Sequence, residues 1–90
     1  DHYCTELRPD VIKLDRRLVH GCSRFEMKQV IVKSFVQIAR EFEIFILAEG
    51  LEAAEDIEFC REIGVKLGQG FGLGMPGKQP IGAMQALCLS

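Results

Sequence analysis

Hydrophobic residues form three short runs along the chain, and each run has the length of a β-strand. The run VIKLD, residues 11–15, contains β-branched and aliphatic residues around one lysine. The run IFILA, residues 44–48, is continuous rather than alternating, which is typical of a strand covered on both faces in a parallel sheet. The run VKLGQG, residues 65–70, predicts a third strand that ends near Gly68.

Amphipathic stretches lie between these runs and predict two helices. SRFE, residues 23–26, has the S-x-x-E pattern of a capping box, in which the two side chains satisfy free backbone amides at a helix start. The apolar face of the helix that follows is formed by residues spaced three or four apart: Met27, Ile31, Phe35, Ile38 and Phe42. A second helix is predicted from about residue 53 to residue 63, because acidic residues lie near its positive N-terminal end and Gly64 is placed to end it. These acidic residues are Glu52, Glu55 and Asp56.

The two ends of the chain give further predictions. Residues 1–8 have a short apolar pattern that stops before Pro9, which indicates the tail of a helix, since the residue before a proline disfavours helical geometry. GLGMPGKQP, residues 72–80, is typical of a loop, and IGAMQALCL, residues 81–89, predicts a closing helix. The N-terminus has neither an initiator Met nor the order of a signal peptide, so we expect a piece of a longer protein.

The alternation of strands and helices predicts an α/β fold with parallel strands joined by right-handed crossovers. Three strands alone rarely make an adequate parallel sheet. We therefore expect part of an open doubly wound sheet or of a closed (β/α)8 barrel. Both architectures bind their ligands at the carboxyl ends of the strands, so the strand ends are where a functional site is expected.

Composition and charge narrow the class of function. The chain has 90 residues, 48% of them hydrophobic and 27% charged, as in soluble globular domains. The net charge is −2, with 11 basic residues mixed among 13 acidic ones, so we expect no nucleic-acid partner and no membrane contact from this segment. Four cysteines without a C-x-x-C pair and only two histidines argue against a zinc site and favour reduced, buried thiols of a cytoplasmic protein.

Polar side chains lie at the end of each predicted strand. Lys13 lies inside an otherwise apolar run, where an unpaired ammonium is costly unless it points into a barrel or cleft. Asp15 either contributes to a site or caps the following turn and pairs with Arg16 or Arg17. Gln69 lies between two glycines, where its amide can bind a ligand or a loop carbonyl.

Glu49 is the most informative of these residues. An acidic residue near a helix N-terminus is favourable by about 0.3–1 kcal/mol. Glu52 is better placed for that structural role, so Glu49 at the tip of an apolar strand remains to be explained by function.

Three segments together resemble the C-terminal half of the EAL domain, the cyclic-di-GMP phosphodiesterase family. The segments are PDVIKLDRRLV, FILAEGLEAAED and GVKLGQGFGLGMP. The corresponding family patterns run P-D-x-(I/L)-K-(I/L)-D, A-E-G-V-E-T and G-x-x-x-x-Q-G-(Y/F). The resemblance extends roughly over residues 7–80, in order and at matching spacing, and is therefore more specific than any one motif.

The resemblance implies a modified TIM barrel, with this chain supplying about its last three strand–helix units. In that family two divalent cations, Mg²⁺ or Mn²⁺, activate a water that cleaves cyclic-di-GMP to linear pGpG. By position, Lys13 matches the lysine that holds the attacking water or a phosphate oxygen. Glu49 matches a metal ligand or base, and Gln69 matches a glutamine that supports the site. We expect Asp15 to bind substrate or support the site in the same way as Gln69. The resemblance also implies a cytoplasmic homodimer with an upstream sensory or regulatory domain.

Departures from the family pattern limit this interpretation. The E-A-L signature, the asparagine and glutamate of the middle strands and the paired aspartates are absent from this chain. One carboxylate cannot hold two cations that each take about six oxygen ligands, so we expect the 90 residues alone to be inactive. Ala53 replaces a usual threonine and Leu51 a usual valine. The alternative is a degenerate domain that acts as a cyclic-di-GMP receptor or a protein-interaction module.

Overall fold

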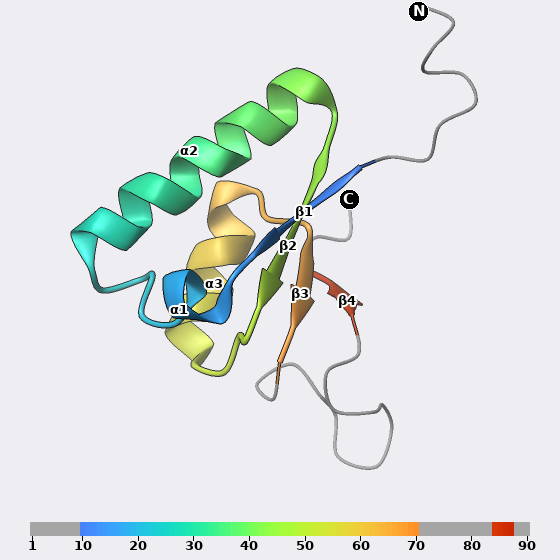
Figure 1. The fold of residues 1–90 in the computed structure, drawn as a ribbon. Helices are drawn as coiled ribbons and strands as arrows, with labels where there is room; N and C mark the ends of the chain where they lie inside the picture. Colours follow the sequence, from blue (N-terminus) through green and yellow to red (C-terminus); the bar gives the residue numbers. More distant parts are fainter. Residues whose placement is uncertain (1–9, 71–83, 88–90) are drawn as a thin grey trace, which may run out of the picture.

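The computed structural model describes residues 10–70 and 84–87, which form one sheet with helices on one side of it (Figure 1). The elements in chain order are β1 (Val11–Leu14), α1 (Arg16–Val19), α2 (Glu26–Phe42), β2 (Phe45–Glu49), α3 (Ala54–Ile63), β3 (Leu67–Gln69) and β4 (Gln85–Ala86). The strand order is β1-β2-β3-β4; β1, β2 and β3 are parallel, and β4 is antiparallel to β3. The predicted α/β class and its three parallel strands are confirmed.

The core lies between the sheet and the helices. Alternate strand residues point to opposite faces of a sheet, and Leu14, Ile46 and Ala48 point toward the helices and are buried there. They pack with Val32 of α2 and Cys60 of α3, which are both fully buried. Lys13, Leu47 and Glu49 alternate with these residues and therefore point to the second face of the sheet, which the described helices do not cover.

The apolar face predicted for α2 is only in part its buried face, since Phe35 alone of the predicted residues packs against the described core. The buried residues of this helix are Val32, Val36 and Ala39. Met27 and Phe42, at the two ends of the predicted face, are 76% and 70% exposed. Apolar residues extend over a broad arc of α2, so the three-to-four spacing fits two adjoining faces, and the described part of the chain covers only one of them.

The predicted capping box is also wrong. The N-cap of α2 is Phe25, which makes no side-chain capping bond. The Ser23 hydroxyl instead donates to Asp56 Oδ1 at 2.6 Å, and the Ser23 amide donates to the same oxygen at 3.0 Å. A capping serine accepts a hydrogen bond from a backbone amide in the first helical turn, but α2 begins only at Glu26, so Ser23 does not cap it and donates to Asp56 instead.

Helix α3 agrees with its prediction, whereas the closing helix does not. Gly64 ends α3 in the left-handed conformation at φ +104°, as its position in the sequence predicts. Within the predicted closing helix 81–89, Gln85 and Ala86 form a strand, and the Leu87 amide donates to the Lys66 carbonyl at 2.8 Å. The edge of β3 needs partners for its backbone groups, and β4 supplies them. Residues 81–83 and 88–89 of that prediction, the helix tail 1–8 and the loop 72–80 lie outside the described residues.

A candidate active site at the carboxyl ends of the strands

Strand register brings three of the predicted site residues to the same face of the sheet. Glu49 is the register partner of Gln69, and Lys13 is the register partner of Leu47, two residues before Glu49. Register partners and residues two apart on a strand share a face, so Lys13, Glu49 and Gln69 all lie on the face away from the helices. Neighbouring strands are about 4.8 Å apart and two residues span about 6.6 Å, so the long Lys13 side chain can reach the level of the Glu49 carboxylate.

Lys13 and Glu49 keep their charged groups available. Lys13 is exposed and Glu49 is partly buried. Neither side chain makes a hydrogen bond or ion pair with another residue in the ranges 10–70 and 84–87. A cation and an anion that face the same region can together bind a polar, charged ligand, and this is the arrangement that the strand-end pattern predicts.

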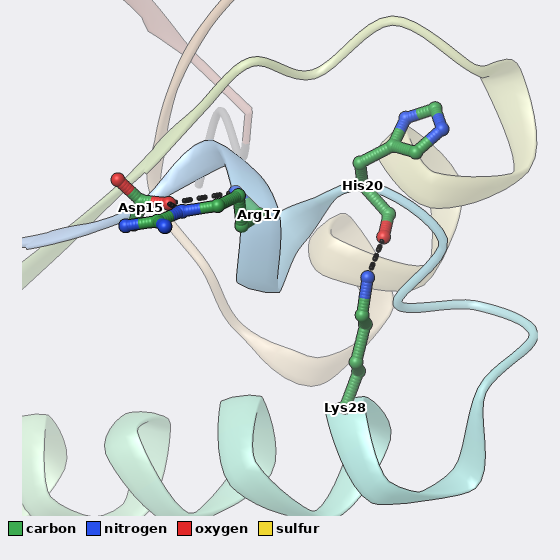
Figure 2. Close-up of polar contacts among 4 residues, drawn as sticks. All are labelled: Asp15, Arg17, His20 and Lys28. Atoms are coloured by element: carbon green, nitrogen blue, oxygen red, sulfur yellow. Dashed lines mark hydrogen bonds and ion pairs between the residues drawn. The ribbon is translucent and has the colours of Figure 1, made fainter.

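Asp15 is engaged with its own turn. It is the N-cap of α1, and its Oδ2 accepts hydrogen bonds from the Arg17 amide at 2.8 Å and from Arg17 Nε at 3.0 Å, as Figure 2 shows. The backbone hydrogen bond, followed by that of the guanidinium, holds the pKa of Asp15 below its ordinary value. These contacts agree with the alternative in which Asp15 caps the following turn and pairs with Arg17. A direct role of Asp15 in a site stays a prediction.

The turn after Glu49 is attached closely to β3. Gly50 adopts φ +75°, which favours glycine, and the Leu51 amide donates to the Gln69 carbonyl at 3.0 Å. A Cβ on Gly70 would lie 2.3 Å from the Leu51 carbonyl oxygen, so only glycine allows this approach. The glycines that follow Glu49 and Gln69 in the sequence thus hold the tips of β2 and β3 together.

Sequence reasoning missed the role of Asp56, a buried carboxylate on α3. Its side chain is 1% exposed and accepts hydrogen bonds from the Gly21 amide, the Ser23 amide and the Ser23 hydroxyl. Burial raises the pKa of Asp56, but these hydrogen bonds and the nearby His20 outweigh it and lower the pKa overall. One signal was present in the sequence: Asp56 precedes Ile57 and lies four residues before Cys60, on the apolar side of the helix.

A shallow basic hollow lies beside α1, the helix that follows the carboxyl end of β1. It has a volume of about 430 Å³ and is lined by Arg16, Arg17, His20 and Lys28. The Lys28 ammonium donates to the His20 carbonyl at 2.6 Å and so ties the start of α2 to the end of α1 (Figure 2). The hollow's arginines are also engaged with carboxylates, Arg17 with Asp15 and Arg16 with Glu52.

The described residues do not form a complete metal site. No three histidine, cysteine, aspartate or glutamate side chains within 10–70 and 84–87 come together in a way that could hold a metal ion. Cys22 and Cys60 are buried free thiols, as predicted, with 3.9 Å between their sulfur atoms. Cys4, Cys88 and His2 lie outside the described residues. None of the described helices has the length and apolar character needed to cross a membrane.

Comparison with protein families and curated proteins identifies the domain type. The profile of the EAL domain matches residues 2–76. The cyclic di-GMP phosphodiesterase PdeR of Escherichia coli is 32% identical over 62 residues, which are 69% of this chain and 9% of PdeR. An uncharacterized signaling protein of Caulobacter vibrioides is 34% identical over 67 residues, which are 74% of this chain and 8% of that protein. The chain therefore spans about a tenth of the length of these relatives.

Solved structures agree with this match. Klebsiella pneumoniae BlrP1, solved with FMN and cyclic diGMP and without metal ions, has a TM-score of 0.66 and 37% identity over 74% of this chain and 18% of its own. A standalone EAL protein from Vibrio cholerae, in a c-di-GMP-bound form, has a TM-score of 0.66 and 26% identity over 72% of this chain and 27% of its own. Both the sequence profile and the fold place this chain in the EAL domain family.

Proposed function

We propose that this chain is the C-terminal part of one EAL-type domain, about the last three strand–helix units of its barrel, and that the complete domain hydrolyses cyclic-di-GMP to linear pGpG. The observation that carries the proposal is the register that puts Lys13, Glu49 and Gln69 on one face at the carboxyl ends of parallel strands. The names of relatives and the cyclic-di-GMP in neighbouring structures support the choice of substrate.

Each residue has a distinct part in this proposal. The Glu49 carboxylate supplies one oxygen ligand for a divalent cation or accepts a proton from the attacking water. The Lys13 ammonium orients that water or neutralises a phosphate oxygen. The Gln69 amide supports the site beside Glu49, and Asp15 acts on it indirectly by capping α1.

A metal site would need ligands from outside these 90 residues. Glu49 fits one position of such a site, since carboxylate oxygen is what Mg²⁺ and Mn²⁺ prefer, and the described residues offer no second and third ligand beside it. When bound, the cations lower the pKa of a water and offset charge on the phosphate. The chain alone is therefore inactive under this proposal. Dimerisation, a sensory or regulatory domain upstream and a cytoplasmic location belong to the same proposal.

The test replaces Glu49 by Gln in a protein that contains the complete domain. We expect the rate of pGpG formation to fall by at least about 100-fold, because even loss of a residue that supports a metal ligand costs roughly 10–100-fold. Glu55→Gln, on the exposed side of α3, is the matched control and should keep the rate within twofold.

Two outcomes would contradict the proposal. Near-normal turnover by the Glu49→Gln variant would refute the role of this carboxylate. A wild-type domain that binds cyclic-di-GMP in calorimetry but releases no pGpG with either Mg²⁺ or Mn²⁺ would refute the catalytic function. That result would support the receptor alternative.

A further inference from the structure

Arg16 lies across the turn that follows Glu49. Its methylene stem packs against Gly50, because a Cβ added to Gly50 would lie 2.5 Å from Arg16 Cγ and 2.8 Å from Arg16 Cβ. Its guanidinium reaches the far side of the turn, with Nη2 3.5 Å from Glu52 Oε2. One side chain from the segment after β1 therefore covers the turn from Gly50 to Glu52.

The opposite side of the same turn is held by β3. Leu51 is fully buried, its amide donates to the Gln69 carbonyl, and Gly70 lies against its backbone. The turn is thus held between a side chain that follows β1 and the backbone that follows β3. Glu49 immediately precedes this turn, so the position of its carboxylate depends on contacts from both neighbours.

We propose that Arg16 is a positioning residue that keeps the Glu49 carboxylate in place relative to Lys13. This inference rests on the proposed function. The Arg16 side chain is 67% exposed and that of Glu52 33%, and ion pairs of this kind contribute little to folding. Arg16 therefore acts mainly through geometry: a catalytic group displaced by about 1 Å can lose about 100-fold in rate.

Arg40 offers a matched control within the same chain. It also covers a glycine with positive φ, since a Cβ on Gly64 would lie 2.8 Å from Arg40 Nη2, and the same atom donates to the Ile63 carbonyl at 3.2 Å. This glycine lies in the turn that leads into the amino end of β3, opposite to the candidate site. Replacing Arg40 thus removes a similar contact without disturbing the turn after Glu49.

The experiment compares Arg16→Ala, Arg16→Met and Arg40→Ala in the complete domain. We expect Arg16→Ala to lower kcat by about 10–100-fold and to raise the Mg²⁺ concentration needed for half-maximal rate, with a small change in KM. Arg16→Met keeps an unbranched stem over Gly50 and should recover part of kcat. Arg40→Ala should keep kcat within twofold, and the melting temperatures of the two alanine variants should fall by similar amounts.

A second readout does not depend on turnover. In the metal-free domain with ¹³C-labelled glutamate, the Glu49 carboxyl resonance, assigned by its loss in Glu49→Gln, should shift in Arg16→Ala and stay in place in Arg40→Ala. Equal kcat in the two alanine variants, or an unmoved Glu49 resonance, would overturn the inference and leave the proposed function standing. A wild-type domain that does not hydrolyse cyclic-di-GMP would overturn both.

Discussion

Replacing Asp56 by Asn tests whether a buried carboxylate holds the loop after α1 against α3. Oδ2 of Asp56 accepts from the Gly21 amide at 2.8 Å, and Oδ1 accepts from the Ser23 amide and the Ser23 hydroxyl. An Asn side chain has the same shape but one acceptor oxygen. If that oxygen accepts from Ser23, the NH₂ group of the Asn side chain faces the Gly21 N–H. One hydrogen bond is then lost, and two donors point at each other.

The expected loss follows from these contacts. A hydrogen bond to a charged acceptor contributes about 1.5–3 kcal/mol, and a buried donor left without a partner costs about 1–3 kcal/mol. We therefore expect the Asp56→Asn variant to lose about 2–4 kcal/mol of unfolding free energy. In a domain of EAL size this corresponds to a melting temperature lower by about 5–15 °C.

The pH dependence gives a second check on the same carboxylate. The folded-state pKa of Asp56 is lowered from the ordinary value of 3.8. Its charge therefore stabilises the fold fully above pH 3.8, and this contribution is lost as the pH falls through the lower, folded-state pKa. The difference in stability between wild type and Asp56→Asn should narrow below pH 3.8.

The assay is thermal unfolding of the complete domain, followed by circular dichroism at pH 7 and at lower pH. Glu58→Gln is the control, because Glu58 pairs with Arg61 at 2.8 Å on the exposed side of the same helix. A surface pair of this kind contributes about 0–1 kcal/mol, so this variant should melt close to the wild type. Equal melting temperatures for Asp56→Asn and Glu58→Gln would refute the reasoning.

Three further predictions follow from local geometry. Gly64→Ala should cost about 1–3 kcal/mol in denaturant unfolding, because φ is +104° there, and a neutral substitution would contradict the left-handed cap. The hydrogen bond with Cys22 and burial raise the pKa of Cys60. Cys60 should therefore resist iodoacetamide at pH 8 in the native domain and react after denaturation, and equal alkylation rates in both states would contradict this. The isolated 90 residues should self-associate in sedimentation experiments, since Met27 and Phe42 are largely exposed; a cooperative monomeric unfolding transition would contradict this.

Strand positions and the rim of the site were predictable from sequence, since both depend on local patterns. Continuous apolar runs indicate parallel strands, and polar residues that interrupt or end them indicate the ligand-binding edge. Parallel register then places Glu49 beside Gln69, and residue alternation puts Lys13 on the same face. The family resemblance and the profile match agree with this pattern.

The errors arose where distant residues compete with local ones. Ser23 fits the sequence pattern of a helix cap, but the N-cap is Phe25, and Ser23 binds Asp56, which lies 33 residues further along the chain. The face of α2 was misplaced because a broad apolar arc does not indicate which part of it packs against the sheet. Gln85 and Ala86 follow a helical pattern in sequence but pair with β3. The periodicity of the sequence cannot reveal that β3 has an open edge.

Arg16 shows why the supporting contacts of a site are harder to predict than the site itself. A catalytic side chain stands out because its charge is unusual at a strand end, whereas an exposed arginine at the start of a short helix is ordinary. Its importance comes from Gly50, 34 positions away, whose missing side chain leaves room for the arginine stem. In the sequence, Gly50 is explained by the turn in which it lies, and Arg16 is explained by its exposure at the surface. Only the packing of one on the other connects them to Glu49.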